Sequence, residues 1–188
     1  MKQYKKSRGF TLPELMITLG VIAIVFSTAV PSVTSMVKNN RLATQLNSIV
    51  THIHVARAEA AKRDVRVILC RSASPNRSTP SCGGDTQIWE SGYIMFADDG
   101  NNSNNVYDAG TDTLLMRGQP SISGVKMRTN GTWNRNLEFN PDGSTNEGGS
   151  TALMALCDSR GDIYGRQILV TANGAPRMYA ENIATCYP

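Results

Sequence analysis

The sequence predicts an α+β protein in which a long N-terminal helix, membrane-spanning in its first half, packs on an antiparallel β-sheet or sandwich domain. Two observations predict this fold. Residues 10–64 read as one continuous helix, apolar at first and amphipathic afterwards. The remaining residues form short β-rich runs separated by turn residues. A helix followed by consecutive strands is typical of the α+β class, and 188 residues suffice for one modest domain beyond the anchor.

Residues 10–37 form the predicted transmembrane helix. Glu14 is the only charged residue in this range, and an apolar run of about 18 residues or more can cross a bilayer. A secretory signal peptide has a shorter apolar region that ends in a small-residue cleavage site, whereas this pattern continues past Pro31. Basic residues before the span place the N-terminus in the cytoplasm by the positive-inside rule; they are Lys2, Lys5, Lys6 and Arg8.

Residues 38–64 are predicted to continue the helix as an amphipathic segment. Apolar residues recur at spacings of three and four, which places them on one face that can pack against a domain. A helix from Phe10 to about Asp64 would be roughly 80 Å long, and Pro31 is expected to kink or loosen it. The apolar positions are Leu42, Leu46, Ile49, Ile53, Ala56 and Ala60.

Residues 65–188 are predicted to form the β-rich globular domain. Short runs of β-branched, aromatic and aliphatic residues are divided by glycine, asparagine, proline and serine, as in antiparallel sheets. The predicted strands cover residues 65–70, 88–89, 93–96, 114–116, 125–127, 137–139, 152–157, 167–171 and 177–179.

Four cysteines, Cys70, Cys82, Cys157 and Cys186, predict two disulfides. An even count in a domain outside the cytoplasm favours disulfides over free thiols, and zinc is disfavoured because no Cys-x-x-Cys pair exists. Three pairings are open. We favour Cys70–Cys82, which closes a loop with two prolines, and Cys157–Cys186, which would fasten the last residues. Each disulfide would contribute about 2–4 kcal/mol.

Glu14 is the energetically costly residue of the apolar helix. An acidic side chain within a membrane helix costs a few kcal/mol, and such residues usually have a partner and a function. No lysine, arginine or histidine lies within residues 10–37 to pair with it. Cleavage between Gly9 and Phe10 would create an α-amino group four residues away, in the same chain or in a neighbour. Glu14 is therefore predicted to be an assembly residue that pairs with an amine.

The stretch GFTLPEL at residues 9–15 resembles the class III leader junction of type IV pilins and type II secretion pseudopilins. The resemblance implies that a prepilin peptidase removes residues 1–9 and methylates Phe10. The family glutamate is the fifth mature residue, and Glu14 is the fifth residue counted from Phe10. Pro13 replaces a commoner aliphatic residue, and proline is tolerated in a first helical turn.

The β-rich domain resembles the GspH/FimT/FimU group, which contains minor pilins and a minor pseudopilin. The resemblance lies in Trp89–Tyr93 and in the closing segment Arg160–Arg177. It implies a pilin-like, GspH-type fold and a minor pilin that helps prime assembly of a type IV pilus and is incorporated at its tip. A GspH-like minor pseudopilin of a type II secretion system is the first alternative.

The same resemblance implies a location and partners. The chain would be a single-pass protein of the bacterial inner membrane, with its N-terminus in the cytoplasm and its C-terminal domain in the periplasm. It would later join a pilus or pseudopilus filament. The implied partners are the prepilin peptidase, other minor and major pilins, and the inner membrane.

A DNA-binding tip pilin, like the FimT proteins of natural transformation, is the second alternative. Arg160, Arg166 and Arg177 lie in or beside the last two predicted strands, where a hairpin could bring them onto one face. FimT proteins bind DNA through a Gly-Arg-x-Arg motif, which here reads Gly-Ala-Pro-Arg at residues 174–177. Without the four basic leader residues, nineteen basic residues become fifteen, equal to the fifteen acidic ones. DNA is therefore not favoured, and the arginines are expected to pair with acids such as Asp158.

No enzymatic activity, metal or cofactor is expected. The sequence has no GxSxG, HExxH or phosphate-loop motif, and His52 and His54 point to different faces of the predicted helix. A loop from Asp99 partly follows the calcium-binding EF-hand pattern, but Asn104 replaces its glycine and Gly110 its final glutamate. A polar turn between two strands is the favoured interpretation.

Processing between Gly9 and Phe10 can be tested by mass spectrometry of the membrane-extracted protein. In cells with an active prepilin peptidase, we expect an N-terminal methylated Phe10 and no peptide from Met1–Gly9. Cells that lack the peptidase are the control, because they should retain the basic leader. An intact leader in the presence of active peptidase would contradict the prediction.

Overall fold

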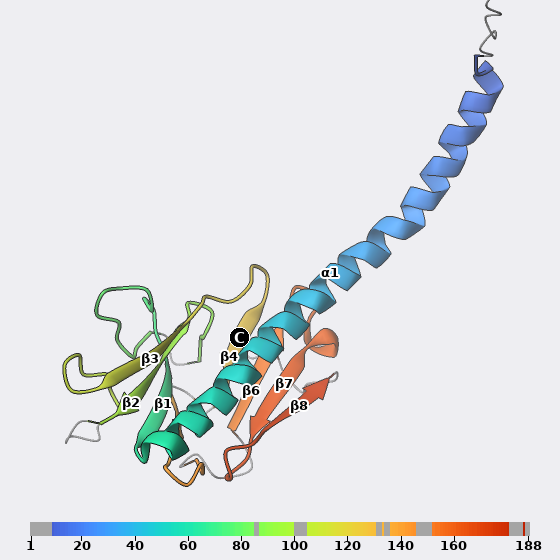
Figure 1. The fold of residues 1–188 in the computed structure, drawn as a ribbon. Helices are drawn as coiled ribbons and strands as arrows, with labels where there is room; N and C mark the ends of the chain where they lie inside the picture. The colour runs from blue at the N-terminus through green and yellow to red at the C-terminus, as the bar shows by residue number, and fades with distance from the viewer. Residues whose placement is uncertain are drawn as a thin grey trace, which may run out of the picture. The chain divides into compact units, whose positions relative to one another are not determined.

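The computed structural model describes residues 9–84, 87–99, 105–130, 133, 136–145, 152–180 and 186. The chain divides into two compact units, Met1–Asn39 and Asn40–Pro188. One long helix contributes to both units, and all the described strands belong to the second (Figure 1).

Helix α1 extends from Leu12 to Arg63 and continues through Pro31 without interruption. It ends where Asp64 adopts a φ of 55°, because a left-handed residue commonly terminates a helix. Lys62 and Arg63 in the last turn place positive charge at the negative end of the helix dipole. The long N-terminal helix predicted from the sequence is confirmed.

Within the described residues, eight strands form two antiparallel sheets. Sheet A has the strand order β3-β2-β1-β5, and sheet B has the order β4-β6-β7-β8. A short 3₁₀ turn, η2 (Asp162–Tyr164), connects β6 to β7. The strands are β1 (Arg66–Arg71), β2 (Tyr93–Asp98), β3 (Thr113–Gly118), β4 (Lys126–Thr129), β5 (Asn136–Phe139), β6 (Ala152–Cys157), β7 (Arg166–Val170) and β8 (Pro176–Ala180).

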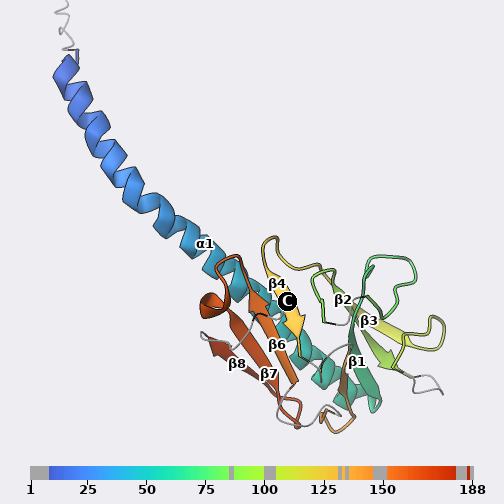
Figure 2. The same cartoon turned by 180° about the vertical axis from the view of Figure 1, so that it is seen from behind.

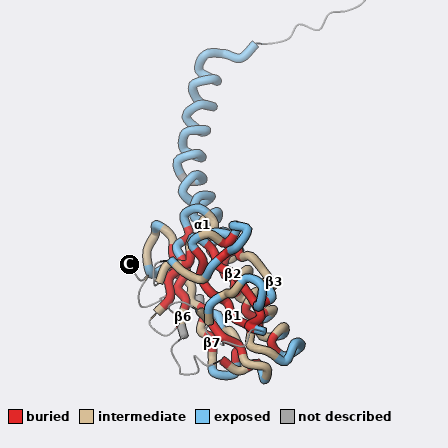
Figure 3. Tube along the Cα trace, turned by 90° about the vertical axis from the view of Figure 1, so that its left-hand side faces the viewer, coloured by how far each residue is buried: buried red, intermediate tan, exposed pale blue. Residues whose placement is uncertain are grey.

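The main core forms where the amphipathic half of α1 packs against both sheets. Its partners include Leu69 and Met95 of sheet A and Met127 and Ile168 of sheet B. Figure 3 shows the buried residues, in red, gathered inside the second unit. The predicted helix face is fully buried, with no residue more than 6% exposed: Leu42, Leu46, Ile49, Ile53, Ala56 and Ala60.

Sheet A is also covered on its second face. Ile68, Cys70, Ile94 and Phe96 form a smaller buried cluster, and the ring of Tyr107 packs edge-on against Phe96 with centroids 5.5 Å apart. Because both faces of the sheet are covered, β2 is buried at all six positions. This double coverage explains why the strand reads YIMFAD, nearly continuously apolar, instead of alternating.

Both predicted disulfides are present. Cys70–Cys82 and Cys157–Cys186 join Cα atoms that are 5.6 and 6.0 Å apart, within the usual range for such bonds. The first ties strand β1 to the loop that follows it. The second fastens residue 186 to the end of β6, where the Cys186 N–H also donates a hydrogen bond to Asp162 over 2.8 Å.

The predicted strand at residues 88–89 is wrong. Ile88 forms only an isolated bridge to Arg128, and Trp89 donates its backbone N–H to the Met127 carbonyl over 3.1 Å. Its ring lies fully buried in the core, 5.8 Å from that of Trp133 in an edge-on arrangement. The apolar character of this short segment therefore reflects core burial of a tryptophan and not membership of a sheet.

Gly174→Ala is expected to destabilise the second unit. Gly174 has a φ of +73°, and a Cβ there would lie 2.2 Å from the Gly143 carbonyl oxygen. Conformational strain and overpacking together should cost about 2–3 kcal/mol, which would lower Tm by about 4–10 °C. Thermal unfolding of the detergent-extracted protein, followed by circular dichroism, measures this change.

Gly161→Ala is the matched control for that variant. Gly161 has a similar φ of +88°, but no atom lies within 4 Å of an added Cβ. It should therefore show the conformational strain of about 1 kcal/mol alone. Equal Tm values for the two variants would show that the contact with Gly143 is not tight.

Candidate functional site

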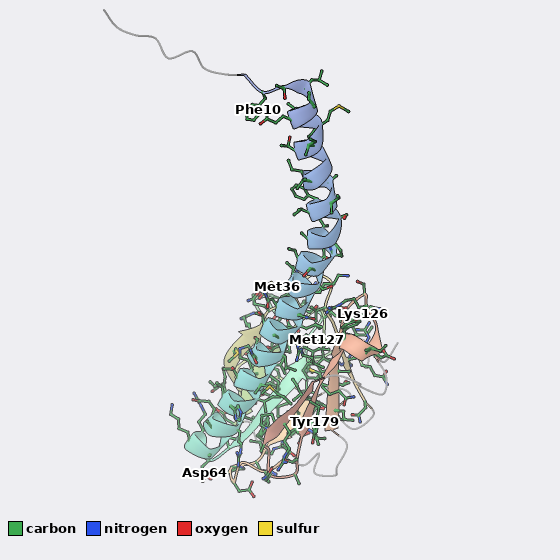
Figure 4. The ribbon with its side chains drawn as sticks, turned by 90° about the vertical axis from the view of Figure 1, so that its right-hand side faces the viewer. Phe10, Met36, Asp64, Lys126, Met127 and Tyr179 are labelled. Atoms are coloured by element: carbon green, nitrogen blue, oxygen red, sulfur yellow. A yellow bond between two sulfur atoms is a disulfide. The ribbon has the colours of Figure 1, made fainter. Side chains whose placement is uncertain are left out.

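The apolar part of α1 is an exposed surface in the isolated chain. Every described side chain from Leu12 to Val37 is exposed, and among the described residues only α1 is long and apolar enough to cross a membrane. Its large apolar side chains range from 44% exposed at Val37 to 81% at the preceding Phe10. Figure 4 shows them on all sides of the helix between Phe10 and Met36. A surface of this size marks contact with lipid or with other protein.

The predicted cleavage junction lies just before this helix. Gly9 and Phe10 are outside regular secondary structure and exposed, and no atom lies within 4 Å of the position of a Cβ on Gly9. The peptide bond between them is therefore accessible to a peptidase. The remainder of the predicted leader, residues 1–8, lies outside the described residues.

Glu14 lies in the first turn of α1. Its carboxylate Oε2 accepts a hydrogen bond from the Thr11 backbone N–H over 3.5 Å, which is one half of a capping box. The first helical bond, from Leu15 N–H to the Thr11 carbonyl, spans 3.2 Å. The acid is thus placed at the positive end of the helix dipole, one turn from Phe10. The Thr-x-x-Glu spacing at residues 11–14 marks this helix start in the sequence, although the prediction of the helix did not use it.

Arg160 is neutralised by a neighbour. Its guanidinium donates to both Asp158 oxygens over 2.7, 3.0 and 3.1 Å and lies 4.4 Å from the Tyr164 ring centroid. Hydrogen bonding to Asp158 raises the pKa of Arg160, because the contact stabilises the charged guanidinium. The predicted pairing with Asp158 is confirmed, whereas Asp162 accepts from Cys186 instead.

Arg166 and Arg177 lie on opposite faces of sheet B. Arg177 is paired with Leu169, and Arg166 with Ala180. Directly opposed residues share a face and side chains alternate along a strand, so Arg177 shares the face of Leu169, whereas Arg166 faces the other way. The possibility that a hairpin brings the three arginines onto one face, which the DNA-binding alternative requires, is therefore contradicted by the register.

The histidines and acids do not assemble a metal site among the described residues. His52 contacts the Tyr93 hydroxyl through Nδ1, and burial lowers its pKa, while His54 is exposed. The acids of the EF-hand-like loop are used locally: Asp99 accepts from the Thr113 hydroxyl over 2.8 Å. The one close group of potential ligands in the described part joins Asp162 to Cys157 and Cys186, whose sulfurs form a disulfide.

Comparisons with known proteins agree with this arrangement. Residues 45–174 match the family described as type II transport protein GspH, and residues 4–30 match the prokaryotic N-terminal methylation motif. The motif implies processing by a prepilin peptidase and association with other pilins. A comparison with curated protein sequences found no match.

Two crystal structures of the type IV minor pilin FimU from Pseudomonas aeruginosa are similar to this fold, both at 15% sequence identity. One has a TM-score of 0.57 over 81% of this chain and 99% of that chain. The other has a TM-score of 0.55 over 78% and 100%, respectively. This similarity shows the fold alone, and it confirms the predicted helix packed on antiparallel sheets.

The arrangement of the arginines predicts weak DNA binding at most. Arg160 is neutralised and Arg166 and Arg177 face apart, so few phosphates could be contacted together, and such binding falls steeply with salt. In gel shifts of the detergent-extracted chain with duplex DNA, we expect no complex at about 0.15 M salt. A tight complex that Arg177→Ala abolishes, but that Lys126→Ala preserves, would overturn this prediction.

Proposed function

The chain belongs to the GspH family, and from this premise we propose that it is a minor pilin subunit of a type IV pilus. In this proposal it helps prime filament assembly and is then incorporated at the filament tip. The family match and the FimU-like fold support a minor pilin or pseudopilin. A structural role fits the pilin family, and we propose no catalytic activity.

The observation that carries the proposal is the apolar segment with one acid at its start. Residues 12–37 expose their described side chains and need lipid before assembly and neighbouring helices afterwards. Glu14 stands one turn from the amine that cleavage at Gly9–Phe10 would create. In a filament, this amine or that of a neighbour would neutralise the carboxylate and set the relative height of adjacent subunits.

The proposed location follows from the charges that flank the span. The four basic residues before Gly9 would hold the N-terminus in the cytoplasm. The second unit would then lie in the periplasm, an oxidising compartment in which the disulfides Cys70–Cys82 and Cys157–Cys186 are expected to form. Residues 1–9 are the proposed leader, residues 10–37 the filament-core helix, 38–64 its amphipathic continuation and 65–188 the globular domain.

A GspH-like pseudopilin of a type II secretion system is the alternative favoured by the description of the matching family. Both assignments involve the same cleavage at Gly9–Phe10 and the same pairing of Glu14 with an amine. They differ only in the filament that the subunit joins. A DNA-binding tip pilin is the weaker alternative, because the arrangement of the arginines provides little cationic surface.

Glu14→Val is expected to leave membrane insertion intact and to reduce incorporation into filaments. Removing the acid makes the span more apolar, which favours insertion by a few kcal/mol, while the Phe10 amine loses its partner. The measurement compares the membrane fraction with the filaments sheared from the cell surface, by immunoblotting for this subunit.

Thr18→Val is the matched control. Thr18 lies one turn further along the same exposed helix, and its hydroxyl donates only a local bond to the Leu15 carbonyl over 2.9 Å. This variant should enter filaments normally. Normal incorporation of Glu14→Val would rule out the pairing role of the acid, whichever filament system the subunit serves.

A further inference from the structure

One end of sheet B exposes large apolar side chains. In η2, Ile163 is 68% exposed and Tyr164 is 50% exposed. The Tyr164 ring is not loosely placed, because it packs on the Arg160 guanidinium, which Asp158 in turn fixes through 2.7–3.1 Å bonds. This end of the sheet therefore presents an aromatic and an aliphatic side chain on an ordered support.

Two exposed cations lie at the same end. Lys126 begins β4 and is paired with Cys157, the last residue of β6 before the loop that contains η2. The Ser123 carbonyl, just before β4, accepts a hydrogen bond from Arg41 over 3.2 Å. Both cations are exposed. Figures 1 and 2 show the turn of η2, in orange-red, at the end of sheet B beside α1.

The length of the chain limits the distance of Arg41, one residue of this end, from the apolar segment. Arg41 follows Val37, the last exposed apolar residue of that segment, by four positions. Four residues span about 14 Å at most even when fully extended. The bound holds for any arrangement of the two units, because it depends only on the number of intervening residues.

We propose that this end, formed by Arg41, Lys126, Ile163 and Tyr164, rests on the headgroup region of the bilayer that holds the apolar segment before the subunit enters a filament. Tyrosine is enriched at membrane interfaces, and each lysine or arginine near anionic lipid favours the surface-bound state by about five-fold. The inference rests on the proposed membrane anchoring. It adds a second, reversible lipid contact that the globular domain must release during assembly.

Tryptophan fluorescence in nanodiscs tests this contact on the full chain. Trp89 and Trp133 are fully buried, so they supply a constant background. The discs contain phosphatidylcholine and phosphatidylglycerol, with or without acyl chains brominated near the headgroup, which quench nearby tryptophan. We expect brominated discs to quench Tyr164→Trp, and this substitution keeps an aromatic face for Arg160.

Val106→Trp is the matched control. Val106 is 45% exposed in the loop between β2 and β3, next to Asn105, whose side-chain oxygen accepts a hydrogen bond from Arg66 over 3.1 Å. Arg66 begins β1 three residues after the end of α1, and that end of α1 is about 33 Å along the helix from Arg41. Tyr164→Trp should therefore lose a larger fraction of its emission than Val106→Trp. Adding Lys126→Gln to Tyr164→Trp should reduce the quenching in anionic discs and leave it unchanged in pure phosphatidylcholine.

Phe26→Trp separates failure of this inference from failure of membrane anchoring. Phe26 lies within the apolar segment, and quenching at this position in discs brominated deep in the acyl chains shows that the helix is in the bilayer. Quenching of Phe26→Trp together with equal quenching of Tyr164→Trp and Val106→Trp would overturn the surface contact and favour a neighbouring subunit as the occupant. Absence of quenching at residue 26 in the deeply brominated discs would overturn the anchoring and the surface contact together.

Discussion

The constraint on which the structure depends is that α1 carries more apolar surface than its own domain can bury. From Leu42 to Ala60 the apolar face is enclosed by the two sheets, and each large side chain there contributes about 1.5–3 kcal/mol. From Leu12 to Val37 the same kinds of side chain are exposed. The second unit therefore has a buried core of its own, whereas the apolar side chains from Leu12 to Val37 are left uncovered. Contact with lipid or with other protein would cover the exposed part.

The buried half of α1 also organises the sheets around it. Each sheet presents one face to the helix, and Ala56 and Ala60 allow the backbones to approach closely. Polar links then join the two sheets. The Glu90 carboxylate, ahead of β2, accepts from the Met127 backbone N–H over 3.2 Å, and the Thr145 N–H, after β5, donates to the Ala172 carbonyl over 2.9 Å. The helix thus supplies the common core, and short-range polar contacts fix the sheets relative to each other.

Local patterns were sufficient to predict the helix, its buried face, most strands and both disulfides. The helical periodicity can be read from neighbouring residues as far as Asp64. The even number of cysteines can likewise be read without knowledge of the fold. The pairing of Arg160 with Asp158 was also predictable, since the two lie two residues apart. The relation of Arg166 to Arg177 was not, because it depends on the register that the turn at residues 171–175 gives to β7 and β8. The division of the strands into two sheets was not predictable either, because it depends on contacts between segments that are distant in the sequence.

In the proposed function, Glu14 makes removal of the leader an energetic condition for assembly. In the isolated chain the Thr11 N–H provides a hydrogen bond to the carboxylate, and solvent or headgroups can satisfy the rest. Among apolar neighbouring helices, an unpaired carboxylate costs a few kcal/mol, unless an amine lies within reach. Cleavage at Gly9–Phe10 creates that amine one turn away and removes four cations that would otherwise be drawn toward the apolar packing. An uncleaved chain lacks the amine and keeps the cations, so both electrostatic terms disfavour its entry into a filament.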